Sequence, residues 1–470
     1  MTHINVMAPL VVGDPADPNS EQSRRARDEF KSHLKLMKDK GVHAVSTDVW
    51  WGLVEPTMGQ YEFGIYDWVA AEIKAAGLKW VPIISMHRCG GNVGDTVNIP
   101  VPTWLWRELA AKILNGVIRD VQCVSEQGNA SDEFISPWAV DVALPYVRGL
   151  FDAFQKHFAG YADIIAEINI SLGPAGELRF PSYNNHDKGT GYPTRGALQC
   201  YSRLARESWT DTCLKKYGSH DGIRAAWGSL ENIEPPVDVD AFFANRVHLL
   251  SQYGKDFFDW YQDSLLAHGR KILTAALETF ARDGAAFKGI DVGAKFPGVH
   301  WRTGTWVNDE MVMGDRLAEL TCGLIRTSLS DWYDEEKGRG YRPIIGLFKE
   351  LQAKGNGSRV VLHFTCLEMA DDADPKANTL AFQLVRWVGN EARRQSVPVK
   401  GENALADTLG MRESWHRMRM AIGMPGRVGL YEGLTILRMS DCVTNATASY
   451  ELENTIRLAN GDSRSEAQAA

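Results

Sequence analysis

Two glutamates stand where a carboxylic acid could do acid–base chemistry. Glu177 follows Gly176 in a Gly/Pro-rich stretch, and Glu402 follows Gly401 at the end of an apolar run. In the stretch around Gly176, the glycine lets the backbone approach a ligand closely. Two such groups on opposite sides of a scissile bond can serve as proton donor and as base or nucleophile. Glu368 and Glu167 compete for these roles, although Glu167 lies within an apolar run and could instead pair with a Lys or Arg.

Short apolar runs that could position these carboxyls recur along the whole chain. Turn residues bound them, and the runs cover residues 4–10, 43–48, 79–85, 163–169, 288–294, 359–364, 397–401 and 433–438. Nearly continuous apolar runs of this length are typical of parallel strands covered on both faces. Eight such strands, alternating with helices, predict an α/β fold of the (β/α)8 TIM-barrel type.

Segments with a helical period lie between the predicted strands. They cover residues 21–40, 66–76, 140–158, 240–268, 380–393 and 448–458. In the segment 240–268, apolar side chains three and four positions apart predict one buried face, made of Leu250, Tyr253, Phe257, Tyr261 and Leu265.

The predicted strands are unevenly spaced. The gaps after the third and fourth strands are much longer than those before them, so we expect loops at about 86–140 and 170–240 to form a smaller lobe over one end of the barrel. Residues 1–445 are then a single domain that includes this lobe. Residues 446–470 are expected to be a C-terminal helix followed by a disordered tail.

Polar residues follow seven of the eight predicted strands. Because barrel enzymes build their active sites at the carboxyl ends of the strands, these residues are expected to meet in one site. Carboxylates, amides, Lys, Arg, His and Trp together suit a sugar, whose hydroxyls need polar partners and whose ring faces stack on aromatics. Among the 15 Trp, we single out Trp50, Trp51 and Trp301 because they stand at strand ends.

The segment 90–95 has three glycines in five positions and ends in Asp95. Neither the glycine spacing nor the residues that follow fit a phosphate-binding loop. A mobile lid that brings Asp95 to a sugar hydroxyl is one interpretation, and an ordinary surface turn is the other.

Composition excludes several classes of protein. The chain has 51 Lys and Arg against 59 Asp and Glu, a net charge of −8, which argues against a nucleic-acid partner. It has no apolar run long enough to span a membrane and no secretory signal at residues 1–12. The seven cysteines lack C-x-x-C pairing, so we expect neither disulfides nor a zinc site and favour the cytoplasm or another intracellular compartment.

Several strings, in order, resemble the β-amylases, glycoside hydrolase family 14. They are GVHAVSTDVWWGLVE, HRCGGNVGDTVNIPVPTW, GPAGELRFPSY, AKFPGVHWR, LHFTCLEM, KGENAL and LRMSD, and the resemblance extends from about residue 5 to 445. It implies a (β/α)8 barrel with a lobe of long loops. It also implies removal of β-maltose from the non-reducing ends of α-1,4-glucans, with inversion at the anomeric carbon.

The resemblance also implies roles for individual residues. Glu177 matches the general acid and Glu402 the general base, and Glu368 matches a position without a catalytic role. The positions that match glucose contacts are Asp48, His87, Asp95, Lys295, His300, Thr365, Asn403, Ala404, Leu405 and Arg438. Inversion requires room for a water, so we expect the two carboxyls to lie ~6.5–9.5 Å apart, with a raised pKa for Glu177 and no metal or other cofactor.

The sequence departs from the family pattern at residues 184–199 and at Arg302, which bears on the outer subsites and not on the catalytic pair. The chain ends soon after LRMSD, so we expect no starch-binding domain and better binding of soluble dextrins than of granules. We also expect a monomer. Two rival interpretations are a non-catalytic glucan-binding protein on the same scaffold and a retaining hydrolase of another glycan.

Overall fold

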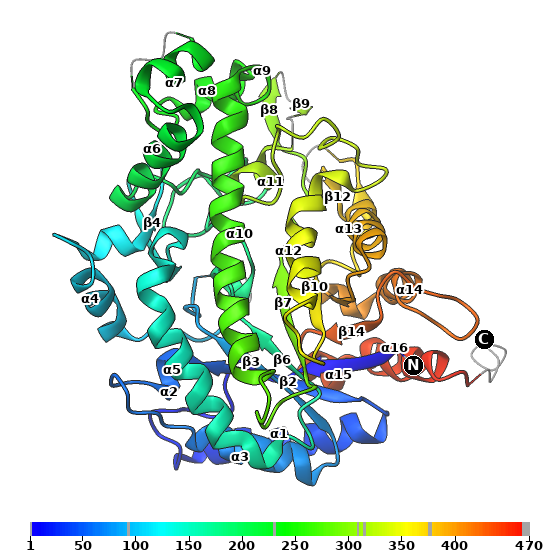
Figure 1. Cartoon of the computed structure of the whole chain (residues 1–470). Helices are drawn as coiled ribbons and strands as arrows, with labels where there is room; N and C mark the ends of the chain where they lie inside the picture. The colour runs from blue at the N-terminus through cyan, green and yellow to red at the C-terminus, as the bar shows by residue number, and fades with distance from the viewer. Residues whose placement is uncertain are drawn as a thin grey trace.

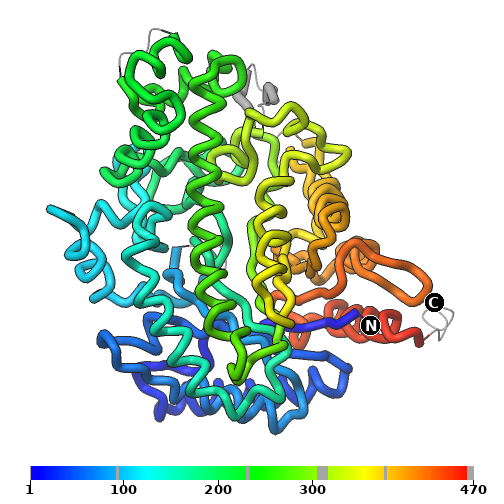
Figure 2. Tube along the Cα trace, in the orientation of Figure 1, coloured from blue at the N-terminus to red at the C-terminus, as the bar shows by residue number. Residues whose placement is uncertain are grey.

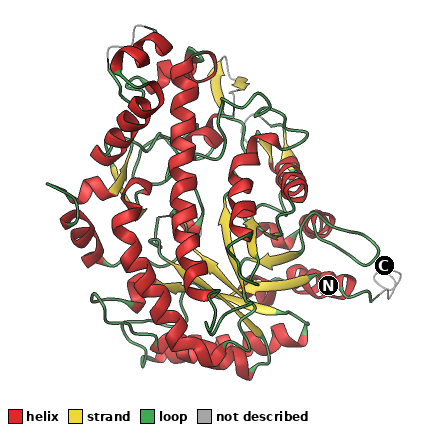
Figure 3. Cartoon of the chain, in the orientation of Figure 1, coloured by secondary structure: helices red, strands yellow, loops and turns green. Residues whose placement is uncertain are grey.

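The computed structural model of the chain describes residues 2–91, 95–228, 232–307, 310–313, 316–374 and 378–462. A closed barrel of parallel strands forms its centre (Figure 3). The strands, in chain order, are β1 (His3–Met7), β2 (Ala44–Trp50), β3 (Lys79–Ser85), β6 (Glu167–Ile170), β7 (Asp291–Phe296), β10 (Val360–Phe364), β13 (Val399–Glu402) and β14 (Gly433–Ile436). The predicted TIM barrel is confirmed, and the ends of its eight strands differ from the predicted ones by at most four residues.

The barrel strands are buried on both faces, as their apolar composition predicts. Every residue of β2 and of β10 is buried. Because side chains alternate along a strand, each strand also directs some residues into the barrel. Those that line a small internal cavity include Glu167, Lys295, His363 and Glu402. The barrel interior is therefore strongly charged near one end.

Helices surround the barrel. They include α1 (Glu21–Asp39), α3 (Gly64–Ala75), α5 (Val140–Phe158), α10 (Gln252–Phe280), α12 (Arg342–Gln352), α13 (Ala381–Gln395), α14 (Arg412–Ala421), α15 (Met439–Thr444) and α16 (Ala446–Ala459). The long helix α10 packs along α5, and both stand in front of the strands in Figure 1. The helices predicted at 21–40, 66–76, 140–158, 380–393 and 448–458 are all present.

The single helix predicted over 240–268 is wrong at its start. Two short helices, α8 (Val239–Ala244) and α9 (Val247–Leu250), precede α10, which then continues to Phe280. The side chain of Ser251 accepts a hydrogen bond from the backbone N–H of Gly254 and so caps α10. Leu250 lies outside the cap and is 74% exposed, so it does not belong to the buried face.

A lobe of long excursions covers one end of the barrel. Between β3 and β6 lie α4 (Thr103–Ala111) and the antiparallel pair β4 (Gln122–Val124) and β5 (Ala130–Ile135). Between β6 and β7 lie α6 (Arg203–Tyr217), α7 (His220–Trp227), α8 and α9, at the top left of Figure 1. Two further hairpins, β8 (Gly304–Val307) with β9 (Glu310–Met313) and β11 (Asp371–Asp372) with β12 (Thr379–Leu380), were not predicted.

The two ends of the chain meet at the barrel's side. The N-terminal strand β1 pairs with β14, and α16 packs against α14 and α15 (blue and red in Figure 2). Lys40 Nζ and Glu453 Oε2, 3.2 Å apart, join the end of α1 to α16. No helix in the described ranges is long and apolar enough to cross a membrane.

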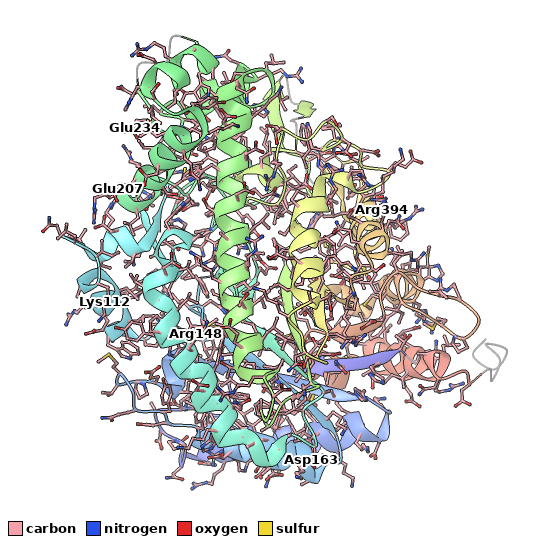
Figure 4. The ribbon with its side chains drawn as sticks, viewed as in Figure 1. Lys112, Arg148, Asp163, Glu207, Glu234 and Arg394 are labelled. Atoms are coloured by element: carbon pink, nitrogen blue, oxygen red, sulfur yellow. The ribbon has the colours of Figure 1, made fainter. Side chains whose placement is uncertain are left out.

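Charged side chains on the outer surface of the molecule form ion pairs that are open to solvent, unlike those inside the barrel. Arg148 lies on the outer face of α5, where its side chain is 41% exposed and pairs with Glu278 at 2.5 Å (Figure 4). Such solvent-exposed pairs contribute little to the free energy of unfolding, about 0–1 kcal/mol.

All seven cysteines are buried free thiols, in agreement with the expected lack of disulfides.

Candidate active site

Glu402 ends strand β13 and is flanked by two cationic side chains. Lys295 Nζ on β7 lies 3.5 Å from Glu402 Oε2, and His363 Nδ1 on β10 lies 3.5 Å from Oε1. Burial alone would raise the pKa of Glu402, but the charges of Lys295 and His363 outweigh it and hold the pKa at about 2. Glu402 is therefore an ionised carboxylate at neutral pH.

Glu177 lies in the turn that follows β6. Gly176 takes a φ of +77° there, and a Cβ on it would lie 3.4 Å from His87 and 3.6 Å from Lys295. Arg179 Nε donates to Glu177 Oε2 at 2.9 Å, and its side chain is 1% exposed. A buried guanidinium therefore fixes the orientation of the Glu177 carboxyl.

Lys295 connects the two glutamates. Its backbone carbonyl accepts a hydrogen bond from Leu178 N at 2.7 Å, which ties the turn of Glu177 to β7, and its ammonium reaches Glu402. Burial would lower the pKa of Lys295, but Glu402, Glu177 and Asp48 raise it overall. A permanently charged ammonium thus stands among three carboxyls.

Asp48 and His87 enclose another side of the site. Ser85 Oγ donates to Asp48 Oδ1 at 2.8 Å, and burial raises the pKa of Asp48 against the opposing charge of Arg438. His87 Nδ1 lies 2.9 Å from Ser171 Oγ. Burial and the charge of Lys295 lower the pKa of His87 to about 3, so its imidazole is neutral.

The loops after β7 and β10 bring His300 and Thr365 to the same end of the barrel. His300 Nδ1 lies 2.5 Å from Thr379 Oγ1, and burial lowers the pKa of His300 to about 4. Thr365 Oγ1 accepts a hydrogen bond from Gly298 N at 3.1 Å. These bonds join the segment after β7 to the segment after β10 and to β12.

The segment after β13 is held by two buried side chains. Asn403 Oδ1 accepts a hydrogen bond from Leu437 N at 2.8 Å, beside Arg438. Glu368 Oε1 accepts hydrogen bonds from the backbone N–H groups of Ala404 (2.9 Å) and Leu405 (2.7 Å). Burial raises the pKa of Glu368 to about 7. One oxygen of this carboxyl therefore supports the loop after β13, and the other, Oε2, is buried without a hydrogen bond within the described residues.

The predicted lid is described only in part. Asp95 Oδ2 accepts hydrogen bonds from the backbone N–H groups of Gly90 (2.8 Å) and Gly91 (3.1 Å), so its carboxylate folds back onto its own loop. Residues 92–94 lie outside the described residues. The lid and the surface turn therefore both stay predictions.

The tryptophans singled out from the sequence are buried. Trp50 is 2% and Trp51 0% exposed, and their indole N–H groups donate to Leu10 O and Glu55 Oε2. The prediction that a sugar stacks on the ring of Trp50 or Trp51 is therefore wrong, because both rings are covered by core residues. Trp301 is 7% exposed and meets Tyr192 edge-on, with ring centroids 5.2 Å apart.

Tyr192 is a candidate that the sequence analysis missed. Its ring is 48% exposed and lies 6.0 Å from the ring of His300. It belongs to the segment 184–199 that departs from the family pattern, and a Gly-Tyr-Pro sequence marks it as a turn. Tyr192 thus places an exposed aromatic side chain beside His300.

Arg179, His363 and Lys400 were also missed. Glu167, which the sequence left as a competitor, does pair with a Lys: its two carboxyl oxygens contact Lys400 Nζ and His363 Nε2. Glu167 lies 196 positions from His363 and 233 from Lys400, and such distant partners leave no local signal, whereas Arg179 stands two positions after Glu177 and could have been found. Across the described part of the chain, no group of three or more His, Cys, Asp or Glu is arranged to hold a metal ion.

Comparisons with known proteins point to one family. The sequence profile of glycosyl hydrolase family 14 matches residues 6–459. A beta-amylase of Cytobacillus firmus is 38% identical over 421 residues, which cover 88% of this chain and 80% of that protein. A beta/alpha-amylase of Paenibacillus polymyxa is also 38% identical, but the match spans only 31% of its length.

Solved structures show the same similarity. The crystal structure of the catalytic domain of the Paenibacillus polymyxa beta-amylase matches with a TM-score of 0.77 and 34% identity, over 97% of each chain. A beta-galactosidase from G. stearothermophilus matches with a TM-score of 0.55 at 12% identity, over 98% of this chain and 57% of that one, and shares the fold alone.

Proposed function

The chain belongs to glycosyl hydrolase family 14, and from that premise we propose that it cleaves α-1,4-glucosidic linkages of starch-type glucans and maltodextrins. It removes maltose units from non-reducing ends and releases them as β-maltose. Similarity to proteins named beta-amylase, at 35–38% identity, supports this substrate and product. Glu177 and Glu402 carry out an inverting reaction.

Glu177 is the general acid in this proposal. Its proton passes to the glycosidic oxygen as the bond to the anomeric carbon breaks. Arg179 Nε donates to Oε2 at 2.9 Å, and the carbonyl oxygen of a neutral carboxylic acid accepts such a bond as well. The Arg179 contact therefore leaves Oε1 to carry the proton toward the substrate.

Glu402 is the general base. It takes a proton from a water that attacks the anomeric carbon from the face opposite Glu177, which converts an α-linkage into a β-product. The two flanking cations keep Glu402 ionised before substrate binds. A carboxylate without its proton is the form that a base requires.

The remaining polar groups bind the glucose units. Asp48, His87, His300, Thr365 and Arg438 stand at the carboxyl ends of strands, where hydroxyls of the sugar would meet them. The ring of Tyr192 offers an exposed apolar face at the outer side of His300. We place the non-reducing end of the glucan toward Asp48 and the outer units toward Tyr192.

One observation carries the proposal. Lys295 holds the turn of Glu177 through its backbone and the carboxylate of Glu402 through its ammonium. Two carboxyls with different cationic partners are thereby fixed around one residue, as an acid and a base with separate roles require.

The test uses maltopentaose with a fluorophore at its reducing end. The proposal predicts unlabelled maltose and labelled maltotriose as the first products. Glu177→Gln and Glu402→Gln should each lower kcat by ~10²–10⁴-fold, since each removes acid or base catalysis. Glu207→Gln, on the surface of α6 (Figure 4), is the matched control and should keep full activity.

Two results would contradict the proposal. Labelled maltose as the first product would mean attack from the other end or within the chain. Tight binding of maltopentaose without hydrolysis would instead favour a non-catalytic glucan-binding protein.

A further inference from the structure

A chain of buried charged side chains lies beneath Glu402. Lys400 Nζ contacts Glu167 Oε2, and Glu167 Oε1 contacts His363 Nε2. The other ring nitrogen, His363 Nδ1, lies 3.5 Å from Glu402 Oε1 and has no hydrogen bond within the described residues. His363 thus stands between two carboxylates, one that it binds and one that it faces.

The strand register brings these groups together. His363 on β10 lies beside Lys295 on β7 and beside Lys400 on β13. Lys400 and Glu402 are two positions apart on one strand and therefore share the face that points into the barrel. The side chains of Glu167 and His363 are 2% and 5% exposed, so their charges are not screened by solvent.

Gly293 leaves the space that this contact needs. A Cβ at this position of β7 would lie 2.2 Å from Glu167 Oε1 and 3.0 Å from His363 Nε2. Any larger residue would therefore separate the two side chains or displace the strand. A site that accommodates the Glu167–His363 contact is built into the barrel wall.

The charge state of His363 follows from these neighbours. Burial alone would lower its pKa, but Glu167 and Glu402 raise it to about 9. Burial would likewise raise the pKa of Glu167, which His363 and Lys400 hold at about 2. His363 is then an imidazolium at neutral pH, a second cation for Glu402 in addition to Lys295.

We propose that His363, held by Glu167 and Lys400, is a positioning residue that fixes one oxygen of Glu402 and keeps this carboxylate ionised at acid pH. The inference rests on the proposed role of Glu402 as the general base. Lys295, on β7, lies 3.5 Å from the other oxygen, so each oxygen of the carboxylate faces a cation. Among the described residues, Asp48 and Glu177 also face Lys295, and Arg438 faces Asp48.

The kinetic test compares His363→Gln and Glu167→Gln with the wild-type chain. Gln at 363 keeps a polar side chain but has no charge to hold Glu402. We expect kcat to fall roughly ten-fold with KM nearly unchanged, since the loss is of orientation and not of glucan contacts. The acid limb of the kcat profile should move up by about one pH unit.

His43→Gln is the matched control. His43 lies before β2, at the opposite end of the barrel, and its ring stacks on His3 with centroids 3.8 Å apart. This substitution also removes a partly buried imidazole, but at the end of the barrel opposite to Glu402. Both kcat and the acid limb should stay at the wild-type values.

A second readout does not depend on activity. In protein labelled with ¹⁵N-histidine, the resonance that His363→Gln removes should report an imidazolium up to about pH 8, above the ordinary range near 6.5. Glu402→Gln and Glu167→Gln should each lower the pH at which this resonance titrates. Glu167→Gln serves both tests if His363→Gln does not fold.

The outcomes separate the two proposals. Wild-type kcat and an unmoved acid limb in both folded variants would overturn the role of His363, as would a neutral imidazole at pH 7. If instead Glu402→Gln stays active while it still alters the His363 titration, the contact is real and the assignment of the general base is wrong.

Discussion

The two glutamates of the site are held by different parts of the molecule. Glu402 ends a barrel strand, and its partners Lys295 and His363 stand on barrel strands as well. Glu177 lies in a turn, and its partner Arg179 donates to Asn184, which in turn binds Glu133 in the lobe. The partners of Glu402 are therefore side chains of the barrel itself, whereas the partners of Glu177 lead through its turn into the lobe.

The largest expected effect is a difference between the Glu177 and Glu402 variants on a substrate whose leaving group needs no proton. An α-maltosyl fluoride needs no protonation of its leaving group, so Glu177→Gln should hydrolyse it at close to the wild-type rate. Glu402→Gln should remain slower by ~10²–10⁴-fold, because water still needs a base. Initial rates of fluoride release measure both. Equal losses in the two variants would remove the distinction between acid and base.

Replacement of Arg179 tests whether contacts with the lobe position the carboxyl of Glu177. Arg179→Lys keeps the charge but loses the planar group that binds Glu177 and Asn184 and lies 4.3 Å over the ring of Tyr183. We expect kcat to fall by about ten-fold, because Lys cannot reproduce this geometry. Arg148→Lys on the surface should change nothing, and an unchanged kcat for both would show that Arg179 has no positioning role.

Substitutions of two glycines compare the stability of the barrel wall with that of the turn before Glu177. Gly293→Ala should lower the free energy of unfolding by about 1–3 kcal/mol, because its Cβ would lie 2.1 Å from Asn169 Oδ1 and 2.2 Å from Glu167 Oε1. Gly176→Ala has ordinary space but a φ of +77°, so we expect a loss of about 1 kcal/mol. Urea unfolding measures both, and the reverse order would contradict the rigid packing inferred for the barrel.

The smallest effect concerns Glu368 and pH. Because its pKa in the folded chain is raised to about 7, the folded state binds a proton more tightly than the unfolded state does. Stability from this group is fully present below about pH 4.5 and is lost as pH rises through about 7. Glu368→Gln should therefore flatten the decrease in melting temperature between pH 5 and 8, and an unaltered pH dependence would contradict a protonated Glu368.

Periodicity and turn residues predicted the barrel, because a buried parallel strand leaves a local pattern of apolar residues. The helix start at Gln252 was missed, since the cap at Ser251 outweighs an apolar spacing that continues through Leu250. The glycine before Glu402 marks a close approach: a Cβ on Gly401 would lie 2.0 Å from a methyl group of Leu367. The sequence-predicted residues after β2, β3, β7, β10 and β13 do gather at one end of the barrel.

Long-range partners could not be predicted in the same way. His363 and Glu167 meet over Gly293 of the strand between them, β7, although they lie 196 positions apart in the chain, and neither type of residue signals the other. Trp50 and Trp51 were misjudged because a strand end can direct an aromatic ring into the core as easily as into a site. Whether an aromatic ring at a strand end lies in the core or in a site depends on packing between segments that are distant in the sequence.

The anomeric form of the first product tests the central claim most directly. Proton NMR of the purified protein with maltopentaose, recorded in the first minutes before mutarotation, should show β-maltose. That result would establish inversion by an acid and a base on opposite faces of the sugar ring. Early α-maltose would contradict it, since a retaining mechanism would make one of the two glutamates a nucleophile.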